Sequence, residues 1–121
     1  MSKTIDYEFK RGDTYNLKKF RITDKNEEVI TLGATDKLYF TLKKNANSPE
    51  VLLQKTIGNG ITLGEDGYYH ITMESVDTSD LPYGTYEYDI EFKVTTPKEI
   101  VKTIVDGSIT LTEEITWRGD E

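Results

Sequence analysis

The sequence predicts an all-β protein, either a β-sandwich or a small barrel, and two observations support this class. Apolar and polar residues alternate with a period of two along most of the chain, which is typical of strands that bury one face. The alternation is clearest where Tyr86, Tyr88, Ile90 and Phe92 are separated by acidic residues. Turn-forming residues interrupt this pattern at short intervals, and no segment keeps helical periodicity over three turns.

The alternation and the turns together define the expected elements. We expect strands near residues 4–9, 14–23, 36–44, 50–56, 60–63, 67–74, 84–94, 99–105 and 107–117. Residues 29–32 add a short edge segment, and residues 95–98 form a hairpin loop. The polar stretch 75–81, which ends before Pro82, holds one helical turn. On the inward phase, Phe40, Ile71, Tyr86 and Ile90 should share one core.

Two positions break the period of two. Leu17 and Phe20 cannot share a face of one regular strand, and Asp106-Gly107 interrupts the last apolar stretch. A β-bulge resets the alternation of a strand in this way. We therefore expect one bulge near residues 17–20 and another at residues 106–107.

Length and composition narrow the classes of function. The 121 residues suit a single domain over 1–121, with an ordered core at about 4–117. The 15 basic and 22 acidic residues give a net charge of −7, which disfavours nucleic acid and anionic membranes as partners. The absence of cysteine excludes disulfides and thiolate metal sites. The sequence shows no signal-peptide core and no apolar run of membrane-spanning length.

No pattern in the sequence indicates catalysis, so we expect no enzyme, no cofactor and no metal. The aspartates fall mostly in turns, where their side chains bond to the backbone, and none has the spacing of a calcium loop. His70, the single histidine, lies on the polar phase of its strand. The tripeptide Arg-Gly-Asp occurs at 11–13 and 118–120, and at the first site Gly12 supplies a tight turn. A small enzyme with a carboxylate site is the weakest interpretation.

Aromatic residues are the better candidates for contact with a partner. Tyr69, Tyr86 and Tyr88 fall on the inward phase and belong to the core. Four other aromatic residues are candidates for an exposed partner surface: Tyr7, Tyr39, Tyr68 and Trp117. They could bind protein or stack on sugar rings.

The segment 79–90, which contains Leu81, Pro82, Gly84 and Tyr86, resembles the tyrosine corner of immunoglobulin-like and fibronectin-type sandwiches. In that motif, a tyrosine hydroxyl bonds back to the backbone before its strand. The resemblance implies an immunoglobulin-like antiparallel β-sandwich, with Tyr86 in the role of the corner tyrosine.

A longer resemblance runs from residue 9 to residue 116. The segments 9–14, 20–24 and 38–44, followed by Gly67-Tyr68-Tyr69, 81–89 and 107–111, are similar in order and spacing to small all-β domains of tailed-phage and prophage structural proteins. The family it resembles is the N-terminal domain of phage baseplate upper proteins. Those proteins continue into a longer or second domain, whereas this chain ends at Glu121, which favours a free-standing virion component.

The resemblance implies a non-enzymatic virion structural protein in the baseplate, in the tail or on the capsid surface. It would be assembled in the bacterial host cytoplasm, and its partners would be other copies of itself, as a homo-oligomer, or other virion proteins. We expect assembly through an edge strand at either end of the chain, 4–9 or 100–117, or through the sheet face beside it. The alternative is a carbohydrate-binding or adhesion module that uses exposed aromatic residues.

Overall fold

The computed structural model describes residues 3–23, 26–30, 32–33, 36–45, 47–94 and 99–113, and the fold is all-β. The chain order is β1 (Lys3–Thr4), β2 (Tyr7–Lys10), β3 (Tyr15–Asn16), β4 (Ile22–Thr23), β5 (Val29–Ile30), β6 (Lys37–Lys43), β7 (Leu53–Ile57), β8 (Gly60–Leu63), β9 (Tyr69–Met73), α1 (Ser75–Thr78), β10 (Gly84–Val94) and β11 (Ile100–Thr112). The predicted all-β class and the predicted helical turn are both confirmed.

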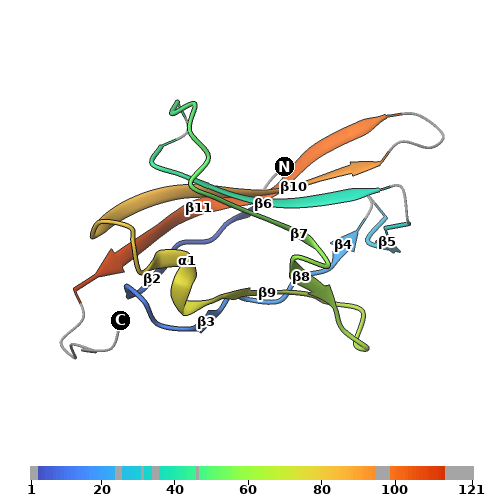
Figure 1. Cartoon of the computed structure of the whole chain (residues 1–121). Coiled ribbons are helices and arrows are strands. Elements are labelled where there is room, and N and C mark those ends of the chain that lie inside the picture. The colour runs from blue at the N-terminus through green and yellow to red at the C-terminus, as the bar shows by residue number, and fades with distance from the viewer. Residues whose placement is uncertain are drawn as a thin grey trace.

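One nine-stranded sheet contains most of these strands. Its order is β1-β11-β10-β6-β7-β8-β9-β3, with β2 also paired to β11, while β4 and β5 form a separate ribbon. The sheet curls so that β6, β10 and β11 form one layer and β3, β8 and β9 form the other (Figure 1). The sheet is mixed rather than wholly antiparallel, because β1 and β2 run parallel to β11, and β7 runs parallel to β8. This strand order does not confirm an immunoglobulin-like sandwich.

The space between the two layers is filled by one apolar core. Phe40 and Ile71 come from opposite layers, and Tyr86 and Ile90 both lie on the inward face of β10, with Tyr88 between them. None of these four side chains is more than 4% exposed, so the predicted core is confirmed. The core also contains Phe9, Leu17, Ile22, Leu38, Leu42, Ile61, Tyr69, Met73, Tyr88, Phe92, Val105, Ile109 and Leu111.

One of the two expected bulges is confirmed and the other lies elsewhere. The Leu17 amide donates to the Ile71 carbonyl at 3.0 Å, and the Phe20 amide donates to the Tyr69 carbonyl at 3.1 Å. From Leu17 to Phe20 the chain advances by three residues, whereas the paired strand β9 advances by two, from Ile71 to Tyr69. The one extra residue is the mark of a bulge. The prediction at 106–107 is wrong, because β11 stays in register with β10 there. The extra residue of β11 is Ile104, between the partners of Ile90 and Glu91.

Gly107 instead leaves the space in which the N-terminal segment packs against the edge of β11. The Ile5 amide donates to the Asp106 carbonyl at 2.9 Å, and the Tyr88 hydroxyl donates to the Ile5 carbonyl at 2.6 Å. The Asp6 carboxylate accepts hydrogen bonds from the Ser108 amide at 2.9 Å and from its hydroxyl at 3.2 Å. A Cβ atom at residue 107 would overlap the Ile5 carbonyl oxygen. Glycine therefore makes this close approach possible.

The N-terminal strands thus form an edge of the sheet, as the sequence predicts. β1 and β2 pair with β11 over residues 105–106 and 109–112. The expectation that the final strand presents an edge is wrong for that stretch, because β11 lies between β10 and the N-terminal strands.

The first Arg-Gly-Asp tripeptide belongs to a structural turn. Gly12 has a positive φ of 83°, and its amide donates to the Thr78 hydroxyl at 2.8 Å. The Arg11 guanidinium donates to the Leu81 carbonyl at 3.3 Å and lies 4.2 Å from the centre of the Tyr83 ring. This arrangement joins the turn to the region of α1. The second copy, at 118–120, lies outside the described residues.

The tyrosine corner forms as the resemblance implies. The Tyr86 hydroxyl donates to the Pro82 carbonyl at 2.6 Å, and the Tyr86 side chain is buried. Burial raises the pKa of this hydroxyl, and the nearby Arg11 charge partly offsets the shift. The bond fastens the start of β10 to the turn that precedes it.

We expect Tyr86→Phe to lower the free energy of unfolding by about 1 kcal/mol, because it removes this hydrogen bond and retains the ring. Urea denaturation followed by far-UV circular dichroism would measure the change. A variant with the same urea midpoint as the parent would show that the hydroxyl does not stabilise the corner.

Candidate functional site

The curled sheet leaves a pocket between its two ends. One wall is formed by Lys3 of β1 and by Ile104 and Val105 at the bulge of β11. These two strands begin the strand order of the sheet. The opposite wall is the segment 18–21, which follows β3 at the other end, together with Tyr68. The pocket has a volume of about 310 Å³. We call it the seam pocket.

Aromatic packing closes the seam at one end. The rings of Phe9 and Tyr15 stack with centroids 4.5 Å apart, and the ring of Tyr7 meets that of Tyr15 edge-on at 5.9 Å. The Lys18 amide also donates to the Tyr7 hydroxyl at 3.0 Å, across the seam. Burial raises the pKa of Tyr7, although the hydrogen bond from Lys18 partly lowers it. Tyr7 therefore marks the closed end of the pocket.

The lining combines an apolar floor, aromatic sides and basic side chains. The floor is aliphatic, and its residues are Ile5, Ile90, Ile104 and Val105. The aromatic residues are Tyr7, Phe20 and Tyr68, and the basic ones are Lys3, Lys18, Lys19 and Arg21. None of the described lining residues is a carboxylate, a histidine, a serine or a threonine. The pocket can therefore bind an anionic group beside an apolar one.

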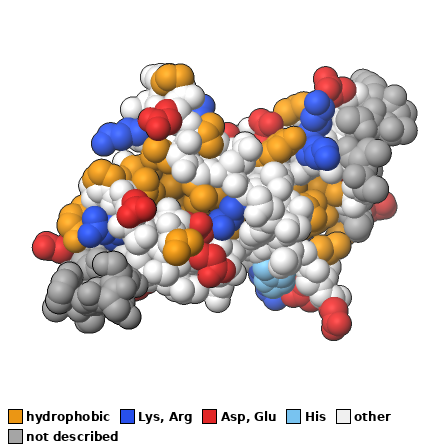
Figure 2. Space-filling view, in the orientation of Figure 1, with side chains coloured by type: hydrophobic (Ala, Val, Ile, Leu, Met, Phe, Trp, Pro, Cys, Tyr) orange, Lys and Arg blue, Asp and Glu red, His pale blue; other side chains and the backbone are white. Residues whose placement is uncertain are grey.

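The concentration of basic residues contrasts with the rest of the chain. Four of its 15 lysines and arginines line this pocket, although the net charge is −7. Across the face drawn in Figure 2, acidic and basic side chains are intermixed. Within the described part of the chain, no carboxylate forms an ion pair with Lys3, Lys18 or Arg21. All three of these basic residues are exposed.

Tyr68 is held at the rim by two cations and a turn. Lys19 Nζ and Arg21 Cζ lie 4.5 Å and 4.7 Å from the centre of its ring. Asp66 Oδ1 accepts a hydrogen bond from the Tyr68 amide at 3.0 Å, and Asp66 Oδ2 pairs with Lys19 at 3.2 Å. His70 Nε2 lies 3.4 Å from Asp66 Oδ1. The pKa of Asp66 is lowered to about 2. The largest cause is the hydrogen bond from the Tyr68 amide, and the side chains of Lys19 and His70 lower it further.

The low pKa of Asp66 predicts a pH-dependent contribution to stability. Because the folded value of about 2 lies below the ordinary 3.8, ionised Asp66 stabilises the fold above pH 3.8. That contribution is lost as pH falls through about 2. Asp66→Asn, which keeps an oxygen acceptor, should melt below the parent near neutral pH. The two melting temperatures should converge in acid; a difference unchanged by pH would contradict the assignment.

The structure brings together two of the four predicted partner residues. Tyr7 and Tyr68 are half-buried and line the seam pocket together. Tyr39 is half-buried on β6 opposite Thr56, away from this pocket. Trp117 lies outside the described residues. The sequence analysis did not single out the basic run Lys18-Lys19-Phe20-Arg21, although its charge contrasts with the acidic chain.

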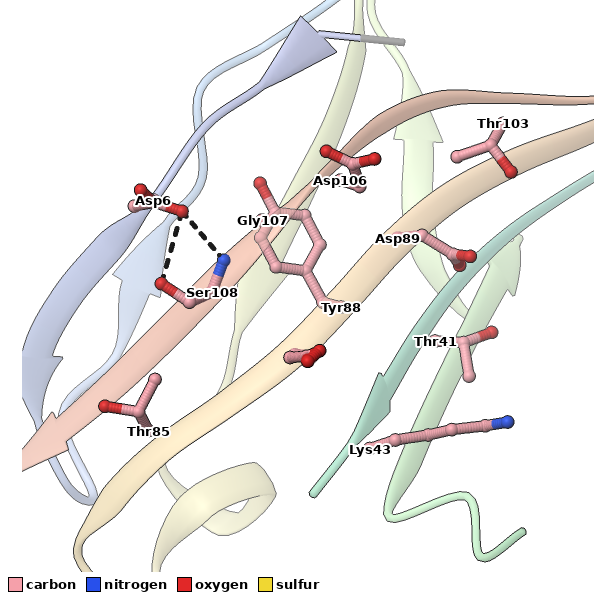
Figure 3. A pocket seen from close by; sticks show the side chains of 11 residues that line it. Asp6, Thr41, Lys43, Thr85, Tyr88, Asp89, Thr103, Asp106, Gly107 and Ser108 are labelled. Carbon is pink, nitrogen blue, oxygen red and sulfur yellow. Dashed lines mark hydrogen bonds between the residues drawn. The ribbon is translucent and has the colours of Figure 1, made fainter. Parts of the chain in front are cut away.

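A second, more open concavity lies on the other face of the sheet, and we call it the outer hollow. It measures about 740 Å³ over β6, β10 and β11. Figure 3 shows Thr41, Lys43, Asp89, Thr103 and Asp106 along these strands. Four carboxylates line it, from Asp6, Glu87, Asp89 and Asp106.

The outer hollow has the character of a solvated sheet face. Asp89 stands opposite Asp106 across β10 and β11. Burial, and to a smaller degree the Asp106 charge, raises the pKa of Asp89, while Lys43 opposes the shift. Among the residues that the structure describes, no three acidic or histidine side chains gather closely enough to hold a metal ion. On the polar phase of β10, Glu87 is exposed, whereas Asp89 and Glu91 are partly buried.

Comparison with known proteins adds no assignment. Neither the protein-family models nor the curated protein sequences match this chain. Within the described residues, no helix has the length and apolar character needed to cross a membrane.

Proposed function

We propose that this protein is a non-enzymatic structural component of a phage or prophage virion and acts by protein–protein assembly. The observation that carries the proposal is the seam pocket, where basic and aromatic side chains surround an apolar floor. Aromatic anchors and arginine are enriched at protein interfaces, and the basic side chains of this pocket contrast with the net charge of −7 of the whole chain. The resemblance to baseplate upper proteins supplies the virion part of the proposal.

Carbohydrate binding is the alternative, and the geometry of Tyr68 argues against it. Stacking on a sugar needs an accessible aromatic face, but Lys19 and Arg21 both lie over the Tyr68 ring. Tyr7 packs against Tyr15 and Tyr88, with ring centroids 5.9 Å away in each case. Both rings are therefore already engaged with neighbouring side chains of the same chain.

The assembly proposal predicts that the protein is a stoichiometric part of a particle. Mass spectrometry of purified virions from the source strain would detect it, and tagged protein should capture other virion proteins from an induced lysate. Its absence from the particles, together with a change in Trp117 fluorescence on glycan titration, would replace this proposal with the carbohydrate alternative.

A further inference from the structure

We infer that the seam pocket receives an extended acidic segment of another virion protein, with one apolar side chain inserted as an anchor. The inference rests on the proposed function and specifies the partner's chemistry. It follows from the charge of the rim, the composition of the floor and the position of the pocket at a sheet edge.

The charge of the rim selects an acidic partner. Lys3, Lys18 and Arg21 are exposed and lie on both walls of the pocket. Among the described residues, the lining contains no carboxylate, and of its four cations Lys19 alone forms an ion pair, with Asp66, while Arg21 lies over the Tyr68 ring. A carboxylate between the walls would meet cations from both sides. Such complementarity guides association and excludes basic partners.

The floor and the volume favour a single apolar anchor. Val105 and Ile90 form a buried base, and the half-buried Ile104 and Phe20 stand beside it. Ligand pockets usually span about 300–1,000 Å³. At about 310 Å³ the seam pocket is at the small end of that range, and it suits one inserted side chain. The basic rim would then contact the residues on either side of the anchor.

The position of the pocket at a sheet edge favours a partner segment that binds in an extended conformation. β1 is at one end of the strand order, and β11 is its only partner among the described strands. An edge strand offers backbone donors and acceptors to an added strand, and side chains of that strand alternate between two faces. Because β1 has only two residues, an added strand beside it could direct one side chain toward the floor, with the flanking side chains facing away. It would continue the sheet toward the segment 18–21.

A random twelve-residue peptide display library, selected on the intact protein, tests this inference. The seam variant is Lys18→Glu with Arg21→Glu, two exposed positions. The control variant is Lys37→Glu with Lys44→Glu, which changes the net charge equally at exposed sites outside the lining. Thermal melts of both variants would establish that each remains folded. Fluorescence anisotropy would then compare their affinities for labelled copies of the selected peptides.

We expect the enriched peptides to be acidic around one aromatic or large aliphatic residue. The seam variant should bind them at least about tenfold more weakly than the parent, and the control variant should bind them almost as well as the parent. Increasing salt should weaken parent binding because the rim charges are exposed. Enrichment of neutral or basic peptides, lack of enrichment, or equal loss in both variants would overturn the inference.

Two further measurements separate this inference from the proposed function and from self-assembly. If the parent captures virion proteins and the seam variant captures them equally well, assembly stands and the seam pocket is not its contact. If sedimentation shows self-association of the parent that the seam variant lacks, a second copy occupies the pocket, and the inference of a different protein is overturned.

Discussion

Phe40→Ala should lower the free energy of unfolding by about 3–5 kcal/mol, because it leaves a large cavity between the two layers. The Phe40 side chain is 0% exposed, and its ring centroid lies 5.5 Å from that of Tyr88. On β6 its neighbours across the ladders are Ile90 and Lys55. The loss is a large part of the roughly 5–15 kcal/mol that stabilises a typical domain. Chemical denaturation would measure it.

Phe40→Leu is the matched control, because it keeps most of the buried apolar volume. Its cost should stay near 1.5 kcal/mol or below. If Phe40→Ala unfolds at the same denaturant concentration as the parent, the assignment of Phe40 to the core is wrong. If the two variants lose equal stability, cavity formation is not the cause.

Gly107→Ala should lower the free energy of unfolding by about 3 kcal/mol, at the upper end for overpacking. The added methyl group would occupy the position of the Ile5 carbonyl oxygen, so the N-terminal segment must move away from β11. The hydrogen bonds of Ile5 with Asp106 and Tyr88 would be lost with it. Hydrogen exchange should show faster exchange at the Ile5 and Ser108 amides.

Two comparisons make this prediction specific. Gly33→Ala should have little effect, because a Cβ atom there would make only an ordinary contact, 3.5 Å from Asp36 Oδ2. Tyr88→Phe should cost about 1 kcal/mol in the parent and almost nothing in Gly107→Ala, whose N-terminal segment has already moved away. The N-terminal segment would be shown to stay in place in Gly107→Ala by either of two results. One is that the stability losses of Tyr88→Phe and Gly107→Ala add up in the double variant, and the other is that hydrogen exchange at the Ile5 amide is unchanged.

The sequence predicted the features of the fold that depend on local pattern. Alternation identified the inward phase of β6, β9 and β10, and the phase break at Leu17 and Phe20 identified a bulge. Pairing between distant segments has no local signal, so the parallel pairing of β1 and β2 with β11 was not predicted. The ion pair of Lys55 also depends on a distant segment and was not predicted. The Lys55 side chain is 8% exposed, and its Nζ lies 2.8 Å from Asp77 Oδ2. Alternation alone cannot identify such a buried ion pair.

The candidate site was predicted only in part, for a related reason. Tyr7 and Tyr68 were selected as aromatic residues outside the expected core, and both line the seam pocket. Lys3 and Arg21 approach the same space only because the sheet curls and brings its two ends together. Gly107 was read as a bulge residue, whereas it provides space for Ile5. In each case the sequence did not show which distant segment of the chain packs beside the residue.

Carbodiimide cross-linking of purified particles tests most directly whether the seam pocket is an assembly contact. The reaction joins a lysine amine to a carboxylate in contact with it, so the cross-linked lysines identify an acidic interface. We predict cross-links from Lys3 and Lys18 to carboxylates of a neighbouring virion protein. Cross-links confined to lysines outside the pocket, such as Lys37, Lys44 and Lys102, would contradict this account, provided that Lys3 and Lys18 stay as reactive toward an amine label as in the isolated protein.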